Sequence, residues 1–475
     1  MTSARRRALY VVVGAVGVIL VVVGTGLLVI DASDYKPRVE AAASAVLGMP
    51  VSVGGRLRIG LLPGLRLTLE DVRVRGRDAD VATAAKVRLG LGFLRLLQGE
   101  VSIETMNMNA VTVSLQRDRE GLFNFERPEG IGDARPPLEL TTVSASGVTL
   151  LYTNLASGEG FEAVDCSLDV RDLRLAGGVR PALMKNVSMM AELSCATFRR
   201  GGFEGSDLKV AVVGKDGTFA LEPVELRLFG AQGTGSMQID VSDAVPHYRV
   251  RYALAQLRID ELFRSLSPRQ PPVGHMNFRA DVSMAGTTVR VMKGTLQGDV
   301  SLRGENLTLN GIDLDRELAQ FESSQSFNLV DVGAFFVAGP FGVVLTKGYN
   351  FASIFQGTGG SSEIRTLVSE WKIEDGIARA RDVALATKEN RIALRGGLDF
   401  VNEQFDGVMV ALIDADGCSI VRQRIRGPFQ KPEVERPNIL RTITGPALGL
   451  LKKGRDLLSD EECEAFYVGS VGPPQ

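Results

Sequence analysis

The stretch that decides the fold is residues 51–74, VSVGGRLRIGLLPGLRLTLEDVRV. Apolar side chains fall on every second position, as at Leu65, Leu67 and Leu69, and glycines and a proline separate the runs. A period of two places apolar and polar side chains on opposite faces of a strand. This pattern is typical of antiparallel sheets that bury one face. The stretch therefore predicts consecutive antiparallel strands joined by tight turns.

The same alternation returns along the chain as far as Leu412, with turn sequences such as Asp216-Gly217 between the runs. A twisted open sheet rarely exceeds about 10 strands without curling or splitting. We therefore expect a mainly β fold, a long and curled antiparallel sheet that forms an open groove or half-barrel with an apolar inner face. The side chains expected to line this groove are the inward members of the alternating runs: Val53, Leu57, Ile59, Leu65, Leu67, Leu69, Val87, Leu89, Val111, Val113, Leu168, Leu226, Leu228, Val250, Phe278, Leu394 and Val410.

Composition narrows the class of function. The 475 residues are 45% hydrophobic and include 53 glycines, which favours a turn-rich β protein with a substantial core. The net charge of −2 argues against a nucleic-acid partner, because phosphate binding needs a basic face. The chain has two histidines and lacks a Walker loop, HExxH, GxSxG and CxxC. We expect no catalytic residues, no metal site and no cofactor, and thus a protein that is not an enzyme.

The first thirty residues predict a membrane anchor. Residues 9–30 contain no charge, and at 1.5 Å per residue they are long enough to span a bilayer core. Arg5, Arg6 and Arg7 precede this segment, which predicts a cytoplasmic N-terminus and export of everything that follows. The alternative is a cleaved signal peptide. Signal peptides have a shorter apolar core, so we favour an uncleaved single-pass anchor.

Helical patterns interrupt the strands at three places. A short helix is expected over residues 35–47, begun by Asp34 and ended by Gly48, and it either packs on the first strands or lies on the membrane surface. Residues 312–321, with 329–337 after them, and residues 438–464 also follow a helical pattern. The predicted organisation is a cytoplasmic stub and anchor over 1–30, a β-groove region over 31–310, a helical insertion over 311–360, a second β region over 361–435 and a helical tail over 436–475.

Four cysteines in an exported chain are candidates for disulfides. Their order suggests Cys166–Cys195 and Cys418–Cys463, although four cysteines allow three pairings. Cys166 and Cys195 sit in apolar phase, so buried free thiols are equally compatible with the first pair. The second pair is favoured because little else would hold Cys463 in the tail.

Behind the anchor, the chain resembles the AsmA family of Gram-negative bacteria. Four stretches carry the resemblance: Tyr35–Val74, Val111–Phe125, Val148–Tyr152 and Ile373–Pro432. The second ends in the acidic-Gly-x-x-Asn-aromatic turn of the family, with Phe125 where tryptophan is commoner. Asn154 stands where the family usually has aspartate after the third stretch. The fourth contains Arg395-Gly-Gly-Leu-Asp399 and ends in the family's Gly-Pro-x-x-x-Pro turn.

The resemblance implies a protein anchored in the bacterial inner membrane, with the bulk of the chain in the periplasm and a role in outer-membrane biogenesis. It also implies a β-groove similar to that of bridge-like lipid-transfer proteins, with phospholipid as the bound partner. A second hypothesis is a non-enzymatic structural or regulatory factor for outer-membrane protein assembly that carries no lipid. A third is an envelope hydrolase, against which the missing triad and metal motifs argue. An outer-membrane or periplasmic partner protein is compatible with the first two hypotheses.

Overall fold

The computed structural model describes residues 32–60, 65–92, 103–120, 122–125, 138–175, 184–201, 203–264, 271–324, 336, 359–435, 438–439 and 463–474. The chain divides into two compact units, Met1–Phe219 (unit 1) and Ala220–Gln475 (unit 2). Strands dominate both units and number 21 over these residues, so the prediction of a mainly β fold is confirmed. The expected anchor over residues 9–30 lies outside the described residues, whose helices are all too short or too polar to span a bilayer.

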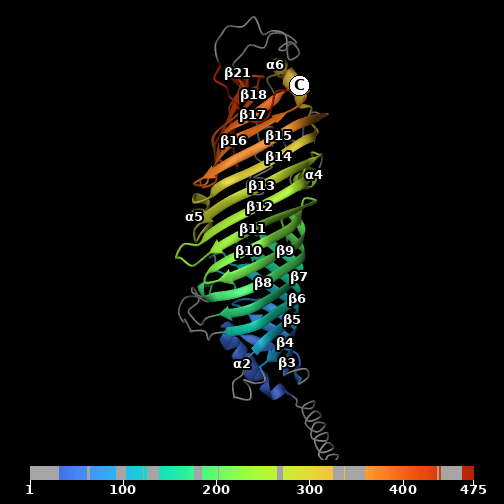
Figure 1. The fold of residues 1–475 in the computed structure, drawn as a ribbon, viewed down its shortest axis with the longest axis vertical. Helices are drawn as coiled ribbons and strands as arrows, with labels where there is room; N and C mark the ends of the chain where they lie inside the picture. The colour runs from blue at the N-terminus through green and yellow to red at the C-terminus, as the bar shows by residue number, and fades with distance from the viewer. Residues whose placement is uncertain are drawn as a thin grey trace, which may run out of the picture. The chain divides into compact units, whose positions relative to one another are not determined.

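Unit 1 contains an open sheet whose strands follow one another in chain order (Figure 1). Its strands are β1 (Val51–Val53), β2 (Leu57–Gly60), β3 (Arg66–Arg75), β4 (Asp80–Leu91), β5 (Ile103–Arg117), β6 (Leu138–Asn154), β7 (Gly160–Leu175), β8 (Val187–Arg200) and β9 (Phe203–Lys215). Both β1 and β2 pair with β3, and from β3 onward each strand pairs with the next. A 3₁₀ turn, η3 (Met184–Asn186), precedes β8.

One pair in this sheet departs from the antiparallel prediction. Strands β5 and β6 run parallel, with Thr105 opposite Thr142 and Arg117 opposite Asn154. A parallel pair needs a long connection that carries the chain back to the starting end of the sheet. The residues between Arg117 and Leu138 supply that length. Alternation within a strand does not reveal the direction of its neighbour, so the sequence pattern could not distinguish this pair.

A line of residues in left-handed conformation crosses the sheet of unit 1. Its members, here called the bulge line, are Asp71, Ala110, Gly147, Asp165 and Asp207, with φ between 48° and 60°. Each interrupts the ladder at a matching level: Asp165 lies just before the Cys166–Cys195 pair, and Asp207 just before the Leu208–Cys195 pair. A bulge bends its strand and increases the local twist. Bends at one level on neighbouring strands curl the whole sheet about that line.

The short predicted helix is present as α2 (Lys36–Leu47), after a 3₁₀ turn η1 (Ala32–Tyr35). Gly48 ends it as expected, with φ 66°. The predicted start is wrong, because Tyr35 and not Asp34 occupies the N-cap position and makes no side-chain cap. The side chains of Ser44 and Glu40 accept hydrogen bonds from the Val51 and Val53 amides at 2.8 and 2.7 Å. The helix therefore satisfies the free edge of β1, which supports packing on the first strands.

Unit 2 continues with twelve strands. They are β10 (Thr218–Leu228), β11 (Ala231–Asp240), β12 (His247–Arg258), β13 (His275–Ala285), β14 (Gln297–Asn310), β15 (Ser361–Glu374), β16 (Ile377–Ala386), β17 (Arg391–Asp399), β18 (Gln404–Ile413), β19 (Ser419–Arg426), β20 (Glu433–Val434) and β21 (Asn438–Ile439). From β11 to β19 each strand pairs antiparallel with the next, and both β20 and β21 pair with β19.

The described part of unit 2 contains three short helices, α4 (Ile259–Arg264), α5 (Val289–Gly294) and α6 (Leu314–Ser324). The helix predicted over residues 312–321 is present as α6. Its Asp315 accepts hydrogen bonds from Thr387 and from Asn390, at 2.5 and 2.6 Å, which fixes the helix to the β16–β17 turn. Most of the rest of the predicted insertion lies outside the described residues. Phe336 is described there; it is fully buried and its carbonyl accepts a hydrogen bond from Ser369.

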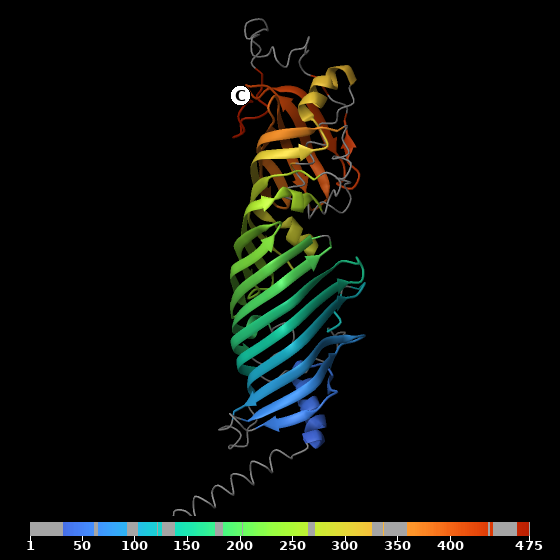
Figure 2. The same ribbon diagram turned by 90° about the vertical axis from the view of Figure 1, so that its right-hand side faces the viewer.

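The prediction of a helical tail is wrong where the tail is described. Residues 438–439 form strand β21, and residues 463–474 contain no helix; residues 440–462 lie outside the described residues. The final segment instead runs along unit 2 (Figure 2), with the Tyr467 amide bonded to the Gly417 carbonyl at 3.0 Å. The segment is held by the β18–β19 turn, where Cys463 is bonded to Cys418, and by β17, where the Arg391 side chain donates to the Val471 carbonyl.

Candidate functional site

Strands β3–β9 of unit 1 carry a continuous apolar face, here called the apolar face. Two rows of directly paired side chains cross all of these strands. The first row is Leu67, Leu89, Met106, Val143, Val170, Ala191 and Val212. The second row is Leu69, Val87, Met108, Ala145, Leu168, Leu193 and Val210. Directly opposed side chains stand about 5 Å apart, so each row is an unbroken hydrophobic strip.

The apolar face is only partly withdrawn from water. Leu69, Val87 and Leu89 are buried, whereas Leu67, Met108 and Leu168 are half-buried. The clusters on this face consist of strand residues, except for Val39 from α2. The described part of unit 1 therefore packs this face mainly against itself through the curl of the sheet. A half-exposed apolar surface of this extent is typical of a binding surface.

The opposite face of the same strands is polar. Between the apolar positions lie Arg88, Asn107, Ser144 and Asp169, each directly opposite the next. The Ser144 hydroxyl donates to Asn107 Oδ1 at 2.5 Å, and Asn109 donates to Ser146 Oγ at 2.7 Å. A shallow hollow of about 560 Å³ lies over these side chains. The sheet therefore separates an aqueous side from an apolar side.

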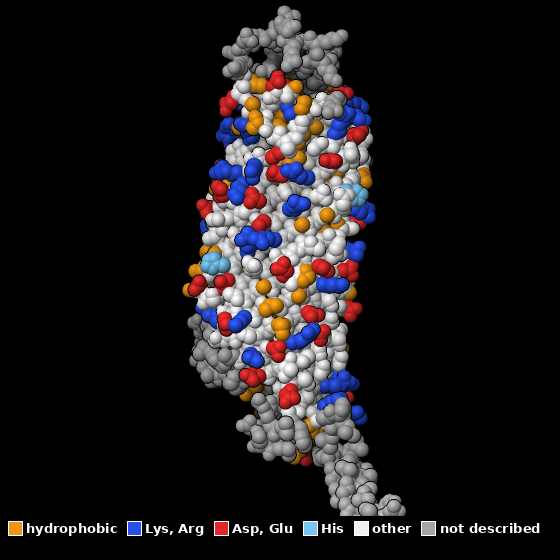
Figure 3. All heavy atoms as spheres, in the orientation of Figure 1, with side chains coloured by type: hydrophobic (Ala, Val, Ile, Leu, Met, Phe, Trp, Pro, Cys, Tyr) orange, Lys and Arg blue, Asp and Glu red, His pale blue; other side chains and the backbone are white. Residues whose placement is uncertain are grey.

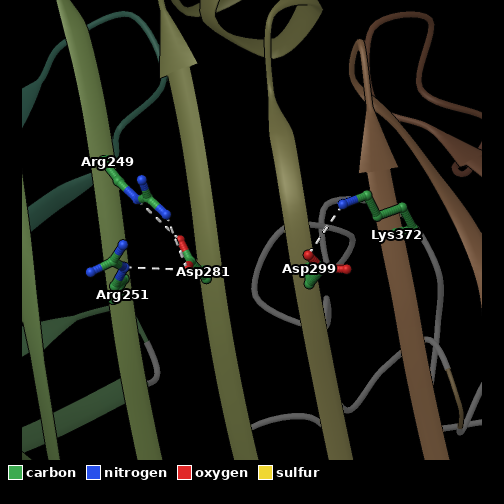
Figure 4. A network of polar contacts seen from close by, with 5 residues as sticks. All are labelled: Arg249, Arg251, Asp281, Asp299 and Lys372. Carbon is green, nitrogen blue, oxygen red and sulfur yellow. Dashed lines mark hydrogen bonds and ion pairs between the residues drawn. The ribbon is translucent and has the colours of Figure 1, made fainter.

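Unit 2 shows the same division of faces. On strands β12–β15, Arg249 and Arg251 contact Asp281 at 3.3 and 3.2 Å, and Lys372 contacts Asp299 at 3.3 Å (Figure 4). Burial acts to raise the pKa of Asp281, but the two arginines lower it below its usual value. Such half-exposed ion pairs add little stability. They keep this face hydrated, and Figure 3 shows both charge signs spread over the face turned to the viewer.

The apolar side of unit 2 changes character along the chain. On the first strands of unit 2, Phe278 of β13 is directly opposite Leu254 of β12 and Leu302 of β14. Tyr252 lies nearby on β12, and burial raises its pKa to about 12. On β15–β19 both faces are filled. Leu367, Leu385 and Ile392 form an enclosed row on one face. Val368, Ala384, Ala393 and Ala411 form a row on the other, covered by Phe466, Tyr467 and Val471.

The covering segment is fixed by polar contacts as well as by packing. The Tyr467 hydroxyl donates to Asp382, and burial followed by this contact raises the pKa of Tyr467. The Arg391 guanidinium lies 5.7 Å from the Tyr467 ring centre and donates to the Val471 carbonyl at 2.9 Å. We define the closed end of unit 2 as β15–β19 with residues 463–474. Its interior is a conventional core.

The structure therefore divides the residues predicted to line a groove. In unit 1, Val53, Leu57, Ile59, Leu67, Leu69, Val87, Leu89, Val111, Val113 and Leu168 belong to one cluster on the apolar face, and Leu65 is half-buried just before β3. In unit 2, Leu226, Leu228, Val250 and Phe278 are half-buried. Leu394 and Val410 are 2% and 0% exposed within the closed end, so they do not line an accessible surface.

Both disulfides join the pairs suggested by cysteine order. Cys166 and Cys195 are directly opposite on β7 and β8, with a Cα–Cα distance of 3.9 Å, and both side chains are buried on the apolar face. Cys418 and Cys463 lie 6.1 Å apart between their Cα atoms and secure the segment over the closed end. Among the described residues, no group of three or more His, Cys, Asp and Glu side chains gathers as metal ligands would.

Sequence reasoning missed a row of aromatic rings on the apolar face. The row, here called the aromatic wall, has successive ring-centre distances of 5.1, 6.3, 5.5 and 6.2 Å. Its members are Phe125, Phe123, Tyr152, Phe161 and Phe198, and all five are half-buried. Phe123 and Phe125 come from the loop after β5, and the other three come from strands. The rings come from four separate segments, so no local pattern could have revealed the row. Met106 and Met108 were also missed, although their alternation with asparagines was a usable signal.

Comparison with known proteins agrees with this architecture. The sequence model of the AsmA family matches residues 191–383. The chain is similar to the AsmA family protein YhjG of Escherichia coli (strain K12), with 24% identity over 283 residues. This alignment covers 56% of the chain but 36% of the relative, so the chain matches about a third of that protein's length. No solved structure matches the chain. In sequence the chain is therefore similar to the AsmA family over residues 191–383, within which the described residues form mainly strands.

Proposed function

We propose that the chain binds phospholipid through the apolar face of unit 1 and conducts it between membranes. In this proposal residues 9–30 anchor the protein in the inner membrane, and the β units act in the periplasm in outer-membrane biogenesis. The observation that carries the proposal is the pair of unbroken apolar rows across β3–β9, which are only partly withdrawn from water. Such a face needs an apolar occupant, because water wets it poorly.

The binding energy would come from acyl chains alone. Burial of a methylene group contributes about 0.8 kcal/mol, so a chain of many methylenes gains affinity without any specific contact. Neighbouring positions along a row are chemically similar, from Leu168 to Leu193 to Val210. A lipid that moves from one strand to the next therefore exchanges one set of contacts for an equivalent set. This mechanism requires no catalytic residue.

The lipid content of two matched variants tests the proposal. Val212 lies on the apolar face of β9, and its neighbour Val213 lies on the polar face and is exposed. We expect Val212→Asp to lower the moles of phospholipid that copurify with the full chain several-fold, whereas Val213→Asp leaves them unchanged. Both variants keep the predicted anchor, so lipid held by the anchor cancels in the comparison. Phospholipid is measured by mass spectrometry of solvent extracts.

Equal phospholipid in Val212→Asp and the unsubstituted chain, with circular dichroism showing a folded protein, would exclude the apolar face as the binding surface. The closed end of unit 2 supports the second candidate, a structural or regulatory factor for outer-membrane protein assembly without lipid cargo. Its two faces are already filled by the chain itself. A fully folded chain that carries no phospholipid would favour this candidate.

A further inference from the structure

The bulge line divides the apolar face of unit 1 into two walls of different chemistry. On one side lies the aromatic wall. On the other side lies an aliphatic wall, which consists of Ile103, Leu140, Leu173, Met189 and Val212. The strands pass through both walls; β8, for example, carries Met189 on the aliphatic side and Phe198 on the aromatic side. The two walls therefore offer different environments to the two ends of any molecule that lies along a strand.

The aromatic wall is the more polar of the two. Ring faces attract cations, and Arg117 lies 6.0 Å from the ring centre of Phe123. Tyrosine is favoured where one end of a side chain is apolar and the other is wet. Tyr152 stands directly opposite Phe161 at this margin. The aliphatic wall has neither ring faces nor a hydroxyl group.

The ends of the walls differ in charge. Beyond the aromatic wall, the next residues on the same face are Arg117, two after Leu115, and Arg200, two after Phe198. Beyond the aliphatic wall, the corresponding positions on β7 and β8 are Leu175 and Val187, which are paired with each other. One margin of the apolar face thus carries guanidinium groups on β5 and β8, and the other carries aliphatic side chains on β7 and β8.

We propose that unit 1 holds a glycerophospholipid in a single orientation across its strands. The phosphate lies beside Arg200, the glycerol region lies on the aromatic wall, and the acyl chains cross the bulge line to end on the aliphatic wall. Guanidinium groups complement phosphate geometry and charge. This inference rests on the proposed function and adds the direction in which the lipid lies. A reversed lipid would place its phosphate against Leu175 and Val187, whose side chains carry no charge.

Two tryptophan reporters on the same strand test the orientation. Phe198→Trp reports on the aromatic wall and Met189→Trp on the aliphatic wall, and the native Trp371 of unit 2 gives a constant background. The full chain in detergent is loaded with phosphatidylcholine that carries a doxyl quencher at acyl carbon 5 or carbon 16. Quenching of the unsubstituted chain is subtracted from that of each variant.

We expect the carbon-5 label to quench Phe198→Trp at least twofold more than Met189→Trp, and the carbon-16 label to show the opposite order. Quenching at both positions with the same ratio for the two labels, or with the reversed order, overturns the orientation but leaves lipid binding intact. Absence of quenching at both positions overturns the proposed function together with the orientation. The outcomes therefore separate the two proposals.

Neighbouring arginines provide a matched test of the phosphate position. Arg200 faces the same side as Phe198, whereas Arg199 lies on the polar face and pairs with Glu204 at 3.2 Å and with Glu162 at 3.9 Å. In the Phe198→Trp background we expect Arg200→Gln to reduce carbon-5 quenching about twofold or more, and Arg199→Gln to leave it unchanged. Equal effects of the two substitutions would overturn the assignment of the phosphate to this margin.

Discussion

The apolar face of unit 1 and the closed end of unit 2 are built from the same kind of paired apolar rows, but they end in different states. In unit 1, Leu168 stays half-buried. Among the described residues, the apolar face is covered mainly by other strands of the same curled sheet. In unit 2, Ala384 and Ala393 are fully buried, because residues 463–474 cover the face on which they lie. Strand pairing alone therefore does not decide whether a face is open; a covering segment does.

The alanine row explains why the closed end accepts its cover. Ala384, Ala393 and Ala411 project little from the sheet, so Phe466 and Tyr467 approach closely. Gly417 adds to this closeness, since a Cβ atom there would stand 2.1 Å from the Tyr467 carbonyl oxygen. The equivalent positions on the polar face of unit 1 carry Asn107, Ser144 and other hydrogen-bonding groups. Water can form hydrogen bonds with the side chains of that face.

The largest expected difference between the two regions is in the stability lost when a leucine is replaced by alanine. Leu385→Ala should lower the free energy of unfolding of unit 2 by about 2–5 kcal/mol, because it leaves a cavity in an enclosed core. Leu168→Ala should cost unit 1 about half as much, since part of that side chain is already in water. Urea unfolding followed by Trp371 fluorescence reports on unit 2, and circular dichroism reports on both units. Equal costs would show that the apolar face is as enclosed as the closed end.

The two disulfides sharpen the same comparison. Replacing Cys418 and Cys463 by serine should destabilise unit 2 by about 2–4 kcal/mol and make residues 463–474 sensitive to proteases. Replacing Cys166 and Cys195 by serine should lower the stability of unit 1 by a similar amount without exposing that segment, because the bond lies between two paired strands. Limited proteolysis with mass spectrometry detects the cut sites. A tail that stays resistant in the first variant would mean that Tyr467 and Arg391 hold it unaided.

The smallest expected effect tests the bulge line. Asp207 has a φ of 54°, so Asp207→Val should cost about 1–2 kcal/mol, whereas Asp207→Gly should be close to neutral. Ser206→Val, one residue earlier, should also be tolerated because its backbone has no positive φ. Thermal unfolding of the three variants gives the order of their stabilities. If Asp207→Val is as stable as Ser206→Val, the left-handed conformation is not required for the curl of the sheet.

Much of the site could be read from alternation. Leu67, Leu69, Val87 and Leu89 lie on one face because side-chain direction in a strand has a period of two. The sequence of the closed end also contains a pattern that indicates burial of both sheet faces. Ala384 sits between Val383 and Leu385, and Ala393 sits between Ile392 and Leu394. Near-continuous apolar runs of this kind indicate strands buried on both faces.

Local periodicity and chain order were enough to predict most of the strands, the faces of their side chains between bulges, and the candidate cysteine pairs. Tertiary structure alone decided the parallel β5–β6 pair, the alignment of the bulge line, the aromatic wall and the cover over the closed end. Each of these depends on residues distant in the chain meeting at one place. A short stretch of sequence does not reveal such long-range contacts, since the contacts stabilise the protein only once the distant segments have come together.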